Sequence, residues 1–166
     1  NNTVLKIYDV DPASPTYTSL LGSFAATSNQ EGTVLHLMGD YVYLGRERTT
    51  GVHHDFIVID VSDPTIPTLA DSAILNLNNG KVVSGVYVTG GVAFIVTTDT
   101  TPANGGGPFI LYDVSDPTDI SLIVPCVAVN WSEIATGLDM MDNYAFVSNE
   151  SNDALQVMYP TTACAS

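Results

Sequence analysis

Short apolar runs recur along this chain at a nearly fixed interval, and an acidic turn follows each of the first three. The runs, each closed by an aspartate, are LKIYD (5–9), FIVID (56–60) and FILYD (109–113). The spacing is 51 residues from Asp9 to Asp60 and 53 residues from Asp60 to Asp113. The turns read Asp-Val-Asp-Pro once and Asp-Val-Ser-Asp-Pro twice. Because β-branched and aromatic residues dominate the runs, the pattern predicts β-strands bounded by turns.

A second motif keeps the same period. Its copies are GDYVYL (39–44), GGVAFI (90–95) and DNYAFV (142–147). Each begins with two residues that tolerate a positive φ, which tight hairpin turns require. Two motifs in register over a period near 50 residues are typical of β-propeller blades.

These patterns predict an all-β fold of propeller-type blades, each a four-stranded antiparallel sheet. Helix is absent from the prediction because no window of 11–18 residues has a 3.6-residue period. About thirteen strands are expected, which amounts to three to four blades in a partial or small ring. We interpret residues 1–166 as one domain with repeats near 4–52, 53–107 and 108–153 and a degenerate copy at 154–166. Closed propellers usually have four to eight blades, so we expect further copies of the chain or more of a larger chain to complete it.

The segment Phe56–Pro64 resembles the LVIVD repeat of bacterial and archaeal surface proteins. The first copy of the acidic turn is one residue shorter, and the degenerate copy has Tyr159 where aspartate is expected. The resemblance implies propeller blades, export and exposure at the cell surface. It carries no catalytic residues to this chain.

The chain is strongly acidic. Four Lys and Arg residues face 18 Asp and Glu residues, for a net charge of −14. Such a chain repels nucleic acid and anionic membrane surfaces. The acidity is explained by solubility through repulsion, or by a requirement for divalent cations. No apolar stretch approaches the roughly 18 residues of a membrane helix, so membrane insertion is not expected.

The chain has two cysteines, Cys126 and Cys164. Neither lies in a zinc or redox motif. We predict a disulfide between them, closing a 38-residue loop and worth about 4 kcal/mol from chain entropy. Two buried free thiols are the alternative.

Loops of variable length connect the strands on one face of the predicted blades, and function tends to lie in such loops. The loop at 45–54 holds Arg46, Arg48, His53 and His54. The arginines suit a clamp for a carboxylate or phosphate. A metal site of the histidines with Asp55 is disfavoured, because adjacent histidines point to opposite sides of an extended chain. The alternative to a ligand site is a solvated loop of mixed charge.

Two further places carry candidate ligand contacts. Trp131 beside Glu133 predicts a stacking platform for a sugar or a protein partner, with burial of the ring as the alternative. A weaker possibility is calcium at Asn149, Glu150, Asn152 and Asp153, because oxygen donors are dense there. The repeated aspartates of the acidic turns lie in successive blades, so we interpret them as turn caps and not as calcium ligands.

No catalytic motif occurs: the chain lacks Gly-x-Ser-x-Gly, and its glycine run at 105–107 is not followed by lysine. The sequence therefore predicts an extracellular or cell-surface module for binding or adhesion, non-catalytic, without a cofactor, whose ligand is a surface glycan or a protein. The alternative is a structural subunit of an extracellular, pilus-like filament or of an envelope layer. A secreted enzyme ranks third.

Overall fold

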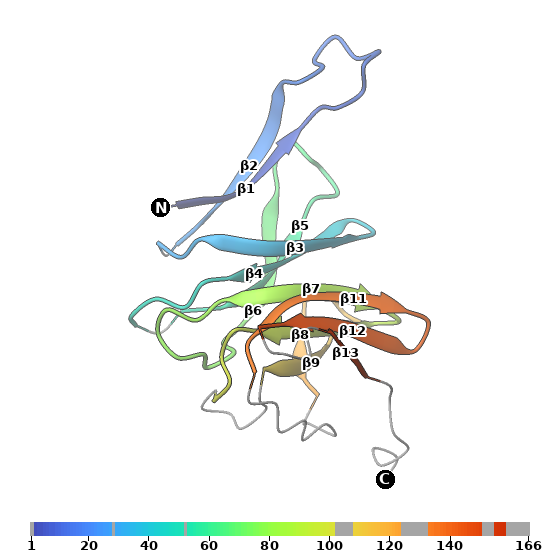
Figure 1. Ribbon diagram of the computed structural model, residues 1–166. Coiled ribbons are helices and arrows are strands. Elements are labelled where there is room, and N and C mark those ends of the chain that lie inside the picture. Colours follow the sequence, from blue (N-terminus) through green and yellow to red (C-terminus); the bar gives the residue numbers. More distant parts are fainter. Residues whose placement is uncertain are drawn as a thin grey trace.

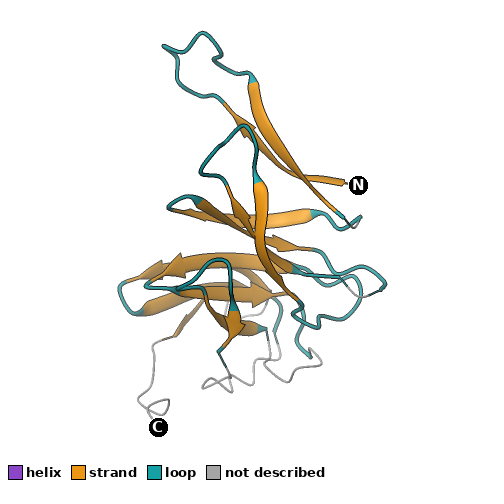
Figure 2. Ribbon diagram, turned by 180° about the vertical axis from the view of Figure 1, so that it is seen from behind, coloured by secondary structure: helices purple, strands orange, loops and turns teal. Residues whose placement is uncertain are grey.

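A computed structural model describes residues 2–27, 29–51, 53–101, 108–123, 133–150 and 155–158. Throughout these residues the fold is strands, turns and loops, with no helix, and the all-β prediction is confirmed (Figure 2). Within the same ranges, therefore, no helix has the length and apolarity needed to cross a membrane.

The strands form four antiparallel sheets in chain order. The first sheet contains β1 (Asn2–Tyr8) and β2 (Leu20–Ala26). The second contains β3 (Gly32–Met38), β4 (Tyr41–Arg46), β5 (Phe56–Asp60) and β6 (Thr68–Ala73). The third contains β7 (Val83–Thr89), β8 (Val92–Thr97), β9 (Phe109–Asp113) and β10 (Ser121–Leu122). The fourth contains β11 (Ala135–Met141), β12 (Tyr144–Asn149) and β13 (Leu155–Met158).

Each strand pairs with its neighbour in sequence, so every described sheet is a simple meander. By repeat position, β3, β7 and β11 are the first strands of their sheets, and β1, β5, β9 and β13 are the third. The first sheet lacks a first and second strand among the described residues, because β1 pairs there with β2 alone.

The sheets stack on one another in series (Figure 1). First strands meet across the stack, with β3 against β7 and β7 against β11. We call the side of a sheet toward the preceding sheet its front face and the opposite side its back face. Between the second and third sheets, the back face carries Tyr43, Phe56 and Val58, and the front face carries Val86, Ile95 and Ile110.

The other two junctions repeat this arrangement. Leu5 and Phe24 of the first sheet pack on Val42, Ile57 and Ile59 of the second. Val96 and Phe109 of the third sheet pack on Ala145 and Val147 of the fourth. Because β5 and β9 are covered on both faces, their sequences are continuous apolar runs without polar alternation.

The acidic turns are capped by their own aspartates, as the sequence predicts. Asp60 Oδ1 accepts the backbone N–H of Ser62 at 2.8 Å, and Asp63 Oδ1 accepts that of Thr65 at 2.9 Å. The same contacts recur in the next repeat at Asp113 and Asp116. These carboxylates are local turn caps in successive sheets.

One glycine marks a close approach between the third and fourth sheets. A Cβ built on Gly85 of β7 would lie 2.6 Å from Val96 Cγ2 of its own sheet, and 2.7 Å from Leu138 Cβ and 2.9 Å from Leu138 N of the fourth sheet. The equivalent Gly137 of β11 is different: a Cβ there would meet Ser148 Oγ of its own sheet at 2.9 Å, and no other described atom lies within 4 Å. The third and fourth sheets can therefore stack closely only because residue 85 lacks a side chain.

Replacing Gly85→Ala should destabilise the protein by about 1–3 kcal/mol, because the added methyl group overpacks the junction with β11. Gly137→Ala is the matched control, since the Ser148 hydroxyl can rotate away. Urea denaturation of both variants measures the difference. Equal stability of the two variants would contradict close packing at Gly85.

The acidic turns also predict acid sensitivity. Hydrogen bonds lower the pKa of Asp63, which accepts from Thr65, and of Asp116, which accepts from Thr118. In each case the side-chain hydroxyl has the larger effect and the backbone N–H the smaller one. A lowered folded-state pKa contributes stability above the unfolded-state value, and that contribution is lost as pH falls through the folded-state pKa. The double variant Asp63→Ala/Asp116→Ala should melt at a lower temperature than the parent at pH 7. This difference should shrink as the pH falls below about 4, the ordinary pKa of aspartate. Calorimetry from pH 7 to pH 2 measures it, and a gap that is independent of pH would contradict it.

Candidate functional site

A groove of about 500 Å³ lies where the end of the first sheet meets the second sheet. One wall is formed by residues 24–27, which are the end of β2 and the residue after it. The opposite wall and the floor come from the second sheet and its loop, through Arg46, His53, His54, Ile57, Leu69 and Ser72. The volume is in the range of ordinary small-ligand sites. Three of the residues proposed from sequence, Arg46, His53 and His54, therefore meet at one cavity.

The groove combines an apolar strip with a polar end. Phe24 and Ile57 belong to the core between the two sheets, and Leu69 of β6 is 51% exposed. Leu69 is at the exposed outer strand, so its apolar surface is available to a ligand. Thr27, Ser72 and the two histidines supply hydrogen-bonding groups beside this strip.

Arg46 corrects one expectation from the sequence. The sequence places it in a loop, whereas the structure places it at the end of β4 with 3% of its surface exposed. Its guanidinium Nη1 donates to the His54 carbonyl at 3.1 Å, and Nη2 donates to the Gln30 carbonyl at 3.3 Å. The hydrogen bonds compensate for burial of the charge and hold the base of the loop. Burial lowers the pKa of Arg46, an effect partly opposed by Asp55.

A buried polar network holds the loop from beneath. Asp55 is fully buried and pairs with Arg48, with Arg48 Nη1 3.3 Å from Asp55 Oδ2. Its carboxylate also accepts from the Gln30 side-chain amide and the Leu75 N–H, each at 3.2 Å. Burial raises the pKa of Asp55, and the nearby Arg48 charge partly opposes that rise. This network fixes the loop on the second sheet before a ligand binds, so ligand binding does not have to order it.

The histidines differ in exposure and in contacts. His53 is half-buried, and its Nε2 lies 3.1 Å from the Thr50 carbonyl. His54 is exposed at the groove. In the described ranges no three His, Cys, Asp or Glu side chains lie close enough together to hold a metal ion. The arrangement offers hydrogen-bonding groups to a ligand beside an apolar strip.

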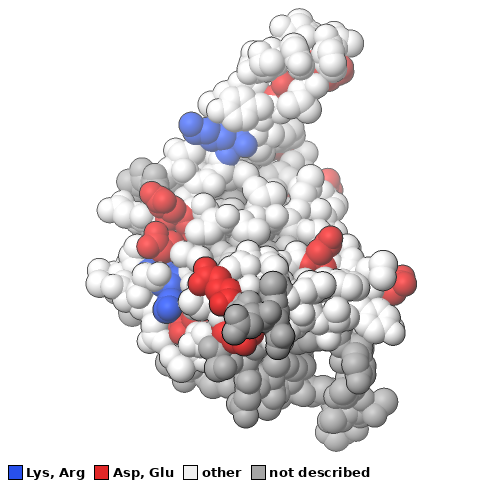
Figure 3. Space-filling model, in the orientation of Figure 1, with Lys and Arg blue, Asp and Glu red and all other residues white. Residues whose placement is uncertain are grey.

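Backbone hydrogen bonds connect the loop that holds Arg48 to the loop around residue 80. Arg48 N donates to the Lys81 carbonyl at 2.7 Å, and Gly80 N donates to the Arg48 carbonyl at 2.8 Å. Buried Asp99 in turn accepts from Asn78 N at 2.6 Å. Basic side chains are sparse on the face in Figure 3, and acidic ones are scattered over it. Arg46 is buried and Arg48 is paired with Asp55, so these two arginines belong to the polar network beneath the loop.

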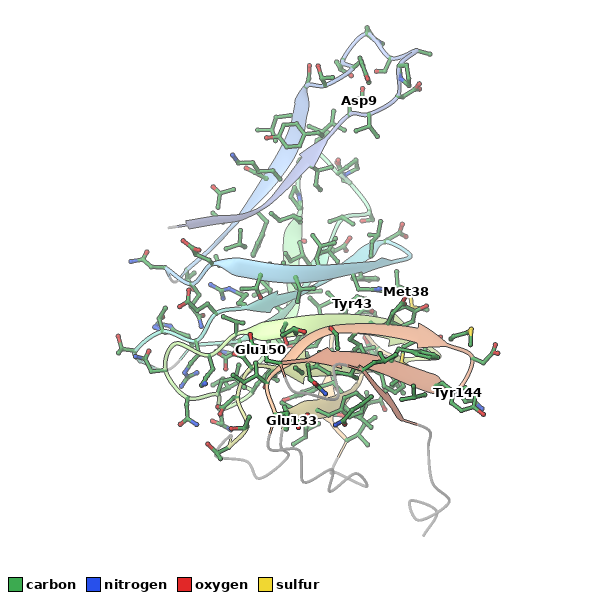
Figure 4. The ribbon with its side chains drawn as sticks, in the orientation of Figure 1. Asp9, Met38, Tyr43, Glu133, Tyr144 and Glu150 are labelled. Carbon is green, nitrogen blue, oxygen red and sulfur yellow. The ribbon has the colours of Figure 1, made fainter. Side chains whose placement is uncertain are left out.

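The remaining candidates lie away from the groove. Glu133 accepts from Gln156 Nε2 at 3.5 Å, and it lies with exposed Glu150 at the loop end of the fourth sheet, opposite Tyr144 (Figure 4). Asn149 is buried at the end of β12. Trp131, Asn152, Asp153, Cys126 and Cys164 lie outside the described residues, so the stacking, calcium and disulfide hypotheses stay predictions.

Sequence reasoning did not identify several groove residues. Phe24 and Leu69 carry no local signal, because only the packing of two sheets places them together. Gln30 likewise has no motif around it, although it is buried beneath the loop. A weak signal exists for Asp55, a charged residue immediately before the apolar run 56–59 of β5.

Asp55→Ala should destabilise the protein by about 3 kcal/mol, because it removes the carboxylate that balances a largely buried arginine. Asp119→Ala, at an exposed aspartate, is the control. Chemical denaturation of both variants gives the free energies of unfolding. A loss at Asp55 no larger than at Asp119 would show that the network is not what holds the loop.

Comparisons with known proteins relate the chain to designed structures. Over 95% of this chain and 79% of the other, the fold matches the crystal structure of the computationally designed Ika4 protein, with 14% identity and a TM-score of 0.61. The crystal structure of the computationally designed Ika8 protein matches 88% of this chain at 14% identity and a TM-score of 0.57, and there the chain spans 38% of the longer protein. At this identity the likeness concerns the fold alone. No protein-family model matches the chain, and no curated protein matches it. The resemblance to LVIVD repeats stays a prediction.

Proposed function

We propose that this chain is a non-catalytic binding module of the cell surface, built from propeller-type blades, whose ligand site is the groove between the first and second sheets. The observation that carries the proposal is the convergence of Arg46, His53 and His54 on a 500 Å³ groove with an apolar strip. Arg46 and Arg48 are tied into the scaffold by hydrogen bonds, so binding requires little ordering of long side chains.

The chemistry of the groove favours a ligand with an apolar face and an anionic group. The apolar face lies along Leu69 and Phe24, and the anionic group lies toward Arg46 and His54. On a protein of net charge −14, the Arg46 guanidinium lies among the residues that line this polar end. An acidic surface glycan has both features, because sugar rings have apolar faces and uronic acids carry carboxylates.

The propeller arrangement is supported by the repeated strand order and by the serial contacts of β3, β7 and β11, which suit first strands gathered around an axis. The location at the cell surface is supported by the resemblance to LVIVD repeats. An acidic chain with few lysines agrees with it.

A second candidate function is that of a structural subunit in an extracellular assembly. The observation that favours it is exposed apolar surface at both ends of the sheet stack: Leu35 and Leu37 of β3, and Leu155 and Val157 of β13. Soluble proteins normally cover such surface.

The binding proposal is tested by titrating the protein with a galacturonic acid hexamer and with its neutral methyl ester, followed by backbone amide NMR shifts. The acidic hexamer should shift amides of residues 24–27, 53–57 and 69–72. Leu69→Ser and His54→Ala should each weaken binding about tenfold, the cost of truncating a central contact. Ile66→Ser is the control, because Ile66 is exposed outside the groove.

Equal binding of the neutral ester, or shifts confined to other surfaces, would contradict an anionic-glycan site. Unchanged affinity in both groove variants would contradict the groove itself.

A further inference from the structure

The front face of β3 is exposed at positions that are buried in the next repeat. Leu35 and Leu37 are 51% and 58% exposed. Their equivalents in β7, Val86 and Val88, are buried beneath the second sheet at 5% and 3% exposure. In register, Leu35 pairs with Leu44 and Leu37 with Val42, both of which are buried. The uncovered surface is therefore confined to the place where a first and a second strand would complete the first sheet.

The back face of the fourth sheet is uncovered in the same sense. Leu155 and Val157 of β13 are 60% and 49% exposed, whereas their equivalents Phe56 and Val58 are fully buried. Tyr144 of β12 is also exposed on this side. The described chain thus exposes two different apolar surfaces, one on β3 beside the incomplete first sheet and one on the fourth sheet.

Gly137 indicates what the second surface accommodates. At the equivalent Gly85, the missing side chain makes room for Leu138 on the front face of the following first strand. At Gly137 no strand of the described chain occupies that room. By repeat position, the counterpart of Leu138 is Leu35, which is itself exposed. The two surfaces are therefore the two halves of the junction that already forms inside the molecule.

We propose that two copies of this chain associate head to tail through these surfaces. Strands β11 and β12 of one copy lie beside β1 of the next and complete its first sheet in the order β11-β12-β1-β2. The back face of β11, at Gly137, then covers Leu35 and Leu37 of the second copy. This inference rests on the second candidate function, the structural subunit, and not on the groove.

The completed sheet follows the pattern of the second and third sheets. Strand β1 pairs only with β2 in the described chain, so its other edge is available for a neighbour, and proteins normally cover such edges. In the assembly β1 takes the position beside β12 that β13 occupies in the single copy. β13 is a weak occupant, because it is four residues long, largely exposed and followed by no acidic turn.

The symmetry of the contact follows from its two different surfaces. A head-to-tail interface either closes into a ring or continues as a filament. Each copy contributes its two four-stranded sheets and one shared sheet. Two copies then supply six sheets, within the four to eight of closed propellers.

The test is sedimentation velocity with multi-angle light scattering on the full chain over a range of concentrations. The parent should form dimers or larger assemblies as concentration rises.

Gly137→Val blocks the back surface and Leu35→Asp/Leu37→Asp blocks the front. Each should weaken association about 100-fold or more, the effect of losing a central contact of about 3 kcal/mol. Val34 occupies this position in β3, where by repeat position the facing residue is the smaller Val86, so a valine there suits the backbone. At position 137 the valine would instead meet the larger Leu35 of the second copy. Ile66→Asp, which places a charge on exposed surface elsewhere, should associate as the parent does.

Mixing the two blocked variants is the decisive step. Each is monomeric alone, but the intact back surface of the Leu35→Asp/Leu37→Asp protein fits the intact front surface of the Gly137→Val protein. Equimolar mixing should restore dimers and nothing larger. A parent that stays monomeric at every concentration overturns both this inference and the structural-subunit candidate. A parent that assembles while either blocked variant assembles equally well, or a mixture that stays monomeric, overturns the head-to-tail contact alone.

Discussion

The second and third sheets of this protein are apolar on both faces, and this constraint governs the rest of the structure. Val58 and Ile59 are adjacent residues of β5 that point to opposite sides, and both are fully buried. A sheet of this kind is stable only between two other sheets, because either uncovered face would expose apolar surface to water. The chain meets the constraint by repeating one unit and stacking the copies. The same constraint is unmet at the two ends of the stack, and this is why the ends resemble the two halves of an internal junction.

The groove and the exposed apolar faces lie on different parts of the molecule and have different proposed roles. The groove lies where the strands run into long connections, and it is held by Arg46, Arg48 and Asp55 beneath the loop. The exposed faces of β3 and the fourth sheet lie along the stack instead. Neither Leu35 nor Gly137 lines the groove. Ligand binding and assembly can therefore be altered separately, and a ring or filament of copies would present one groove for each copy.

The strands were predictable from sequence because their signals are local. Runs of β-branched and aromatic residues, Gly-Asp or Asp-Asn turns and the Asp-Pro caps all act within a few residues. The motif residues after each hairpin turn, 41–44, 92–95 and 144–147, therefore lie inside the observed strands β4, β8 and β12. The groove was predictable only in part. Arg46, His53 and His54 share one loop and were grouped by proximity in the chain. Phe24 and Leu69 line the same groove only because one sheet packs on another, and no local sequence pattern encodes that packing. Burial of Arg46 depended on the carbonyl of Gln30, sixteen residues away, for the same reason.

Hydrogen–deuterium exchange of backbone amides as a function of protein concentration tests most directly whether a second copy covers the exposed apolar faces and the free edge of β1. The amides of β4 have partners on both sides within one chain and should be protected at every concentration. The free edge of β1 has no partner among the described strands, so its amides should exchange fast in dilute solution and become protected as concentration rises. Fast exchange along that edge of β1 at every concentration would contradict the account. So would full protection in dilute monomer, because it would mean that the chain covers its own open edge.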